Sequence, residues 1–112
     1  MGTRNSRFEI FQLRQEENNR KLAFVPLKYL RERKISIQRK RYDLVYSANM
    51  DQLESLDVLY FKFNVDQPAD FTGHSLSISD VVVLQKDGIS HAFYVDDKGF
   101  TEVPEFLDGL SK

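Results

Sequence analysis

The sequence predicts a single α+β domain, in which a mostly antiparallel sheet of four to five strands is covered on one face by one or two helices. Three observations lead to this prediction. A length of 112 residues corresponds to one domain. Short runs of alternating apolar and polar residues are typical of strands, while one longer run has helical spacing. Two turns that contain glycine separate β-rich runs near the C-terminus, as in an antiparallel meander.

The first half of the chain is expected to contain two strands and one short helix. Alternation in RFEIFQL, at 7–13, predicts the first strand. A polar loop follows, and Pro26 is well placed in the first turn of a helix that runs to about Lys34. The second strand is expected at 41–50. One of its faces should carry three side chains, Tyr42, Leu44 and Tyr46.

The main helix is expected at 52–63, where the hydrophobic period changes. Asp51 and Glu54 resemble a capping box at its start. The residues that recur at helical spacing are Leu53, Leu56, Tyr60 and Phe63. We expect the last three to be buried against the sheet, where their neighbours should be Leu44, Leu76, Val82 and Phe93.

The last third of the chain predicts a three-stranded meander. A loop with Pro68 and Gly73 leads into a β-rich run at 75–85. Turns at 86–88 and 97–99 then separate two further strands. Pro104 stands at the start of a short final helix.

The domain itself is expected to span 7–107, between a disordered leader at 1–6 and a flexible tail at 108–112. The chain contains no cysteine, which excludes disulfides and thiolate catalysis. It also has no apolar run near the roughly 20 residues that a membrane helix needs. These features favour a cytoplasmic protein.

Charge is distributed unevenly along the chain. Residues 1–50 carry 12 basic and 5 acidic residues, a net charge of +7, and residues 51–112 carry 4 basic and 12 acidic residues, a net charge of −8. The basic stretch at 28–41 is a possible binding surface for nucleic acid or for an acidic partner. Its candidate residues are Arg31, Arg33, Lys34, Arg39, Lys40 and Arg41. All of these except Lys34 are specifically expected to be largely exposed.

The stretch GHSLSISD, at 73–80, contains residue types that can build a hydrolase. A nucleophile elbow requires Gly-x-Ser-x-Gly before a helix, whereas here the second glycine is missing and β-branched residues follow. His74 and Ser75 are adjacent in an extended segment, so their side chains point to opposite sides. We therefore interpret the stretch as a turn into a buried strand, with Asp70 and Asp80 capping backbone N–H groups and Gly73 at positive φ.

The same region carries a family resemblance. FNVDQPADFTGHSLSISDVV, at 63–82, and YVDDKGFTEVPEF, at 94–106, strongly resemble the bacterial YodL-like domain. The resemblance is carried by motif residues whose role is either structural or functional. They are Pro68, Asp70, Phe71, Gly73, His74, Ser75, Ser77, Ser79 and Asp80. The resemblance implies a host among the Firmicutes, an association with mobile elements and an accessory role without established chemistry.

The leading functional hypothesis is a small accessory module that binds a protein partner. Small size and polarised charge favour it, and the sequence shows no cofactor motif, no metal-ligand spacing and no convincing catalytic set. Two alternatives stay open. One is a nucleic-acid-binding accessory protein that uses the basic stretch, and the other is a hydrolase that uses the 73–80 motif.

Overall fold

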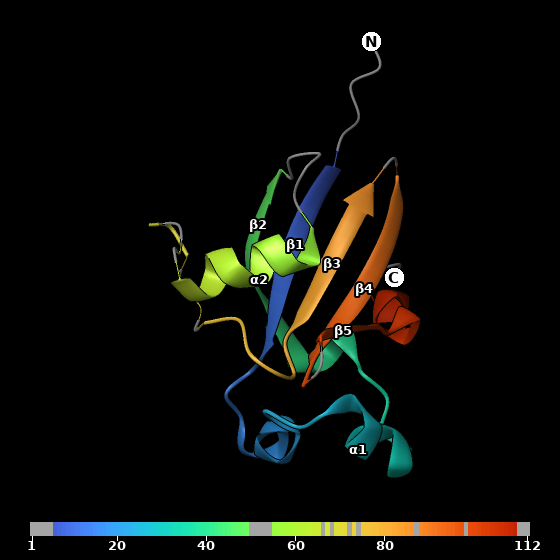
Figure 1. The fold of residues 1–112 in the computed structure, drawn as a ribbon. Coiled ribbons are helices and arrows are strands. Elements are labelled where there is room, and N and C mark those ends of the chain that lie inside the picture. Colours follow the sequence, from blue (N-terminus) through green and yellow to red (C-terminus); the bar gives the residue numbers. More distant parts are fainter. Residues whose placement is uncertain are drawn as a thin grey trace.

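The computed structural model describes residues 6–49, 55–65, 67, 69–71, 73, 75–86, 88–97 and 99–109. These residues form one α+β domain around a five-stranded antiparallel sheet (Figure 1). The strands are β1 (Ser6–Leu13), β2 (Tyr42–Asn49), β3 (Val81–Lys86), β4 (Ile89–Asp96) and β5 (Gly99–Glu102). Their order across the sheet is β2-β1-β3-β4-β5. The predicted fold class is therefore confirmed.

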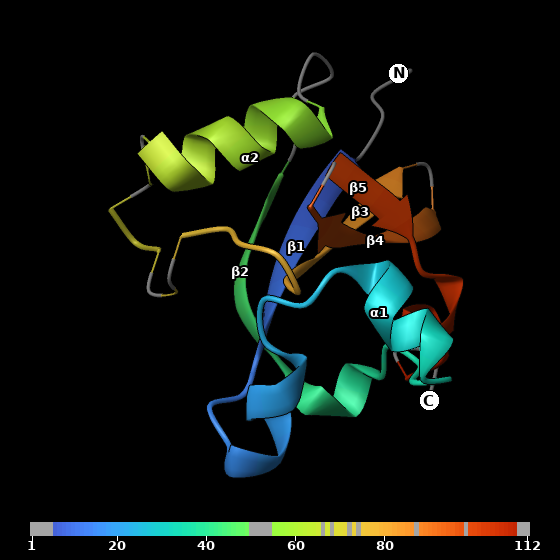
Figure 2. The same ribbon diagram turned by 60° about the horizontal axis from the view of Figure 1, so that its bottom comes forward.

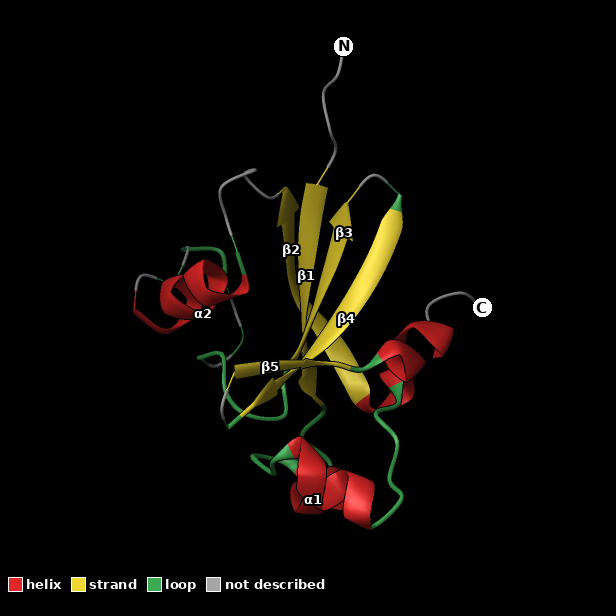
Figure 3. Ribbon diagram, turned by 45° about the vertical axis from the view of Figure 1, so that its right-hand side comes forward, coloured by secondary structure: helices red, strands yellow, loops and turns green. Residues whose placement is uncertain are grey.

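The described residues also form two α-helices and three short 3-10 helices (Figure 3). The α-helices are α1 (Leu27–Glu32) and α2 (Leu56–Val65), and the 3-10 helices are η1 (Glu17–Leu22), η2 (Arg39–Arg41) and η3 (Pro104–Gly109). The helix predicted from Pro26 thus ends two residues early, since Lys34 has a φ of 57° and cannot continue it. No helix in the described part of the chain is long and apolar enough to cross a bilayer.

The predicted meander is confirmed as β3, β4 and β5. Both of its turns carry a glycine at positive φ, Gly88 at 81° and Gly99 at 121°. The first strand of the meander begins at Val81, six residues later than the predicted 75, because a turn occupies Ile78 and Ser79. Because of that turn, Asp80 precedes β3 and does not stand as a carboxylate among the apolar positions of a strand.

Helices cover both faces of the sheet, which corrects the expectation of one covered face. Figure 2 shows α2 on one side and α1 with η3 on the other. The core beneath α1 and η3 includes Phe11, Tyr42, Val81, Val83, Tyr94 and Phe106. The core beneath α2 includes Phe8, Ile10, Leu59, Phe63, Leu76 and Val82. Strands buried on both faces explain why β3 reads as the continuous apolar run VVVL.

A bulge in β2 changes the face on which its side chains lie. Ile10 pairs with Tyr46 and Phe11 pairs with Leu44, so Val45 has no partner in β1. Tyr42 therefore packs under η3 while Tyr46 packs under α2. The prediction that these tyrosines share a face is wrong. Leu44, which was expected in the core, is exposed.

Helix α2 buries a different set of residues from the predicted one. The described helix begins at Leu56, and the predicted start with Leu53 and the capping box lies outside the described residues. Leu59 and Phe63 are fully buried and Leu56 is half-buried. Tyr60, which was expected in the core, is exposed and meets the edge of Phe100 at the flank of the helix.

Candidate functional site

Asp80 is the centre of the architecture around the sequence motif. Its side chain is buried, and its Oδ2 atom accepts hydrogen bonds from Gln12 Nε2 at 3.0 Å and from the backbone N–H of Ser77 at 2.9 Å. The backbone of Asp80 joins the end of β4, because its carbonyl accepts from the N–H of Val95. The predicted capping role of Asp80 is confirmed.

Ser79 occupies a strained turn immediately before Asp80. Its φ is 90°, a conformation that non-glycine residues rarely adopt. Three contacts hold it there: its N–H donates to Val95, its carbonyl accepts from the Tyr42 hydroxyl at 2.7 Å, and its Oγ accepts from the N–H of Phe24 at 3.1 Å. Burial raises the pKa of Tyr42, and the nearby Tyr94 and Asp80 raise it further, so this hydroxyl remains a donor.

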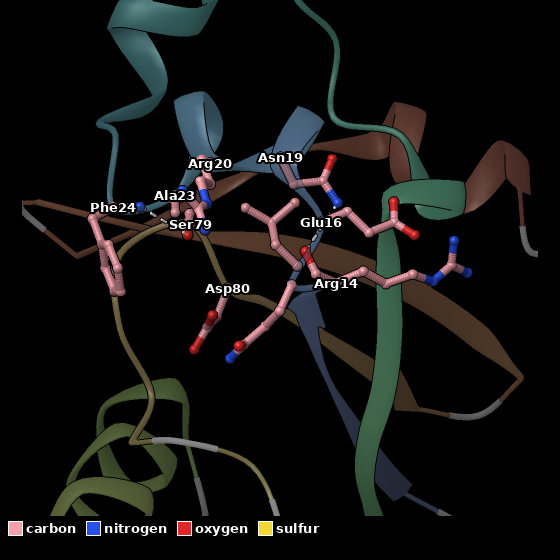
Figure 4. A pocket seen from close by; sticks show the side chains of 10 residues that line it. Arg14, Glu16, Asn19, Arg20, Ala23, Phe24, Ser79 and Asp80 are labelled. Atoms are coloured by element: carbon pink, nitrogen blue, oxygen red, sulfur yellow. Dashed lines mark hydrogen bonds between the residues drawn. The ribbon is translucent and has the colours of Figure 1, made fainter.

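A cavity of about 300 Å³ opens beside this turn, between η1 and the start of β3. Figure 4 shows Phe24 and Ser79 on one side of it and Glu16 and Arg14 on the other. Phe24 also has a positive φ, 61°, and its ring is exposed. The described lining residues carry both charge signs and include no histidine, so they contain no Ser–His pair.

Gly73 is required by a close approach and not by its backbone angle. The sequence predicted a positive φ for Gly73, and this prediction is wrong. Among the described glycines only Gly88 and Gly99 have a positive φ. A Cβ atom at position 73 would instead lie 2.4 Å from Oε1 of Gln12 and 3.1 Å from the Phe71 ring. Gln12 cannot easily yield, because it is buried and bound to Asp80.

The other described motif residues also make structural contacts. Phe71 packs edge-on against Phe63 and Tyr46, and Asp70 forms a hydrogen bond with the Tyr46 hydroxyl. Ser75 Oγ accepts from Gln67 Nε2, and Ser77 Oγ donates to the Ser75 carbonyl. Pro68 and His74 lie outside the described residues. The described part of the motif thus fixes the path from α2 into β3.

The basic residues of 28–41 do not form one exposed surface. Arg31, Arg33, Lys34 and Lys40 are exposed, but Arg31 is paired with Glu105 and the guanidinium of Arg33 lies 3.6 Å from the centre of the Tyr29 ring. The expectation that Arg39 and Arg41 are largely exposed is wrong, as both are half-buried. Arg39 lies over the Phe11 ring and donates to the Tyr42 carbonyl, and Arg41 contacts Asn19.

The outer face of α2, defined here as Val58, Phe61 and Val65, is the feature that sequence reasoning missed. These side chains are 46%, 63% and 67% exposed and lie opposite the buried Leu59 and Phe63. Helix α2 is therefore apolar on both its inner and its outer side. The spacing i, i+3, i+7 was visible in the sequence and could have indicated a second apolar stripe.

No group of three His, Asp or Glu side chains in the described part of the chain could hold a metal ion.

The profile of the YodL-like domain matches residues 7–106. The chain belongs to the YodL-like domain family. The match covers the described strands, apart from Ser6 at the start of β1, and both α-helices, and the resemblance read from the motifs at 63–82 and 94–106 is confirmed. No curated protein and no solved structure matches the chain.

Proposed function

We propose that this YodL-like domain is an accessory module that binds a protein partner through the outer face of α2. The observation that carries the proposal is the row of Val58, Phe61 and Val65, three apolar residues that are all exposed on one side of the same helix. A helix with a second apolar side has more apolar surface than one face of a sheet can cover. Contiguous exposed apolar side chains are characteristic of interaction sites.

Phe61 is the expected anchor of the interface. It is the largest side chain of the row, and it makes no aromatic ring contact within the described residues. Aromatic side chains dominate the energetics of protein interfaces because they bury a large area for few rotatable bonds. The exposed Asp57 flanks the row, so the partner should present an apolar surface with a basic group beside it.

The basic stretch supports nucleic-acid binding less well. Arg31, Arg39 and Arg41 all make contacts within the domain, which leaves few cations to neutralise phosphates. The motif at 73–80 likewise supports hydrolysis less well, because the carboxylate of Asp80 is held by Gln12 and Ser77.

The proposal is tested by affinity purification of the tagged protein from its native host, with Phe61→Glu compared with the unchanged chain. Proteins that bind through the outer face of α2 should be lost with Phe61→Glu. Ile89→Glu is the matched control, because Ile89 is 61% exposed, close to the 63% of Phe61, but lies at the start of β4. Recovery of the same proteins with Phe61→Glu as with the control would contradict the proposal.

A further inference from the structure

Two strained residues meet at the cavity between η1 and β3. Three non-glycine residues in the described part of the chain have a positive φ, namely Phe24, Lys34 and Ser79. Lys34 follows the end of α1, where a residue of this conformation often ends a helix. Phe24 and Ser79 instead line the cavity, and the N–H of Phe24 donates to Ser79 Oγ. Strained residues that the surrounding structure holds in place cluster at ligand sites, so this pair indicates such a site.

The cavity has the size of a small-molecule site. Its volume of about 300 Å³ lies at the lower end of the range for ligand pockets. Leu13 ends β1, Phe24 follows η1 and Ser79 precedes β3, so segments that are far apart in the sequence form the wall together. No residue of α2 is among the described lining residues. The cavity is therefore separate from the outer face of α2.

Arg20 supplies a cation that the domain itself does not use. It lines the cavity from the last turn of η1, is exposed, and makes no side-chain hydrogen bond or ion pair with any part of the chain that the structure describes. Arg14, the other cation of the lining, is held by Asp43 and by the carbonyl of Lys40. Figure 4 shows Arg20 and Phe24 on the same side of the cavity, beside Ser79. A cation and an aromatic residue that is 64% exposed thus lie on one side of the cavity.

The charges of the lining restrict the class of ligand. Arg14 and Arg20 are basic and Glu16 and Asp80 are acidic, so the formal charges of the described lining cancel. A doubly charged group such as a phosphate ester would keep one negative charge near these carboxylates after Arg20 had neutralised the other. A carboxylate carries a single charge and forms paired hydrogen bonds with a guanidinium. The exposed ring of Phe24 favours a planar apolar group on the same ligand.

We propose that this cavity binds a small aromatic carboxylate. Its carboxylate accepts hydrogen bonds from the guanidinium of Arg20, and its ring packs against Phe24. The hydrogen bond from the N–H of Phe24 to Ser79 Oγ fixes the backbone that carries this ring before the ligand arrives, which lowers the entropic cost of binding. The site shares no residue with the outer face of α2, so the inference goes beyond the proposed function.

The test is an NMR titration of the nitrogen-15-labelled full chain with phenylacetate. Saturable shifts are expected for the backbone amides of Arg20, Ala23, Phe24 and Ser79, which line the cavity. Three matched probes separate the contributions: phenylacetamide lacks the charge, acetate lacks the ring, and phenyl phosphate carries a second charge. The first two should bind at least about tenfold more weakly than phenylacetate. Phenyl phosphate should bind no more tightly than phenylacetate.

Variants then show which side chains hold the probe. Arg20→Gln should lower the affinity for phenylacetate about tenfold, because it removes the cation. Lys21→Gln is the matched control and should leave the affinity unchanged, since Lys21 is an exposed neighbour in η1 that does not line the cavity. Phe24→Ala should also lower the affinity about tenfold, because it removes the ring. Circular dichroism checks the fold of each variant, and substitutions at the exposed Arg20 and Lys21 should retain it.

Several results would overturn the inference. The absence of saturable shifts at phenylacetate concentrations up to about 20 mM would exclude the site. Equal affinities of Arg20→Gln and Lys21→Gln for phenylacetate would exclude Arg20 as the cation that binds it. Phenylacetamide that binds as tightly as phenylacetate, or phenyl phosphate that binds more tightly, would exclude the carboxylate as the recognised group. None of these results depends on the outer face of α2, so the proposed function is tested separately.

Discussion

Replacing Asp80 with alanine should destabilise the domain strongly. The carboxylate is buried and accepts from Gln12 Nε2 and from the N–H of Ser77 through one oxygen atom. Alanine leaves both donors without this acceptor, and a buried donor without a partner costs about 1–3 kcal/mol. Two donors therefore give a loss of about 2–6 kcal/mol, a large part of the usual stability of a domain.

Asp80→Asn is the informative control. It keeps the shape of the side chain, and its oxygen can take the place of Oδ2 and accept from both Gln12 and Ser77. The two hydrogen bonds then go to a neutral oxygen in place of a charged one. We expect a loss of about 1–2 kcal/mol, since hydrogen bonds to charged groups are stronger than those to neutral ones.

Urea-induced unfolding measures both variants. The chain contains no tryptophan, so circular dichroism and tyrosine fluorescence are the suitable signals. Coincident transitions from the two signals would justify a two-state analysis. A loss below about 0.5 kcal/mol for Asp80→Ala would refute the architectural role, because it would show that the two hydrogen bonds contribute nothing net.

Three further predictions concern the core, the close approach at Gly73 and acid stability. Leu59→Ala should cost about 2–5 kcal/mol, because Leu59 is fully buried on the inner side of α2, whereas Phe61→Ala should cost under about 0.5 kcal/mol. Equal losses of stability for the two variants in urea-induced unfolding would show that α2 presents another side to the sheet. Gly73→Ala should cost about 1–3 kcal/mol of stability through the clash with Gln12. A double-mutant cycle with Gln12→Ala should show coupling between the two substitutions, whereas additive losses of stability would exclude the clash. Burial alone would raise the pKa of Glu105, but hydrogen bonds from Arg31 and from the N–H of Ile37 lower it below its usual range. Its contribution is thus complete above about pH 4.3 and is lost as the pH falls through the lowered pKa, so Glu105→Gln should flatten the fall of Tm in acid; an unchanged slope would contradict this assignment.

Much of the strand content could be predicted because alternation and turn residues act locally. The strand at 7–13, the two glycine turns and the meander all follow from short sequence patterns. The capping role of Asp80 was also predictable, because a carboxylate at an apolar position of a strand requires donors within a few residues.

The face of each element was harder to predict. One unpaired residue, Val45, moves Tyr46 to the face opposite Tyr42, and nothing in the local pattern signals that bulge. In α2 apolar residues lie on two opposite sides of the helix, so periodicity could not distinguish the buried Leu59 from the exposed Phe61. A helix with two apolar sides has no unique amphipathic face.

The cavity could not be predicted from the sequence at all. It depends on the contact of the N–H of Phe24 with Ser79 Oγ, two groups that are 55 residues apart. Both residues adopt positive φ values that their side chains disfavour, so propensity argues against the observed turn. Only the packing of η1 and β3 around them determines these conformations.

The central claim is that the outer face of α2 is covered when the domain acts. Carbene footprinting measures this directly, because the label reacts with exposed apolar side chains. The tagged chain is labelled once in dilute purified form and once in a concentrated extract of its native host. The account predicts that labelling of the 56–65 segment, and of Phe61 above all, falls in the extract while labelling of Ile89 does not. Equal labelling of Phe61 in both samples would contradict it.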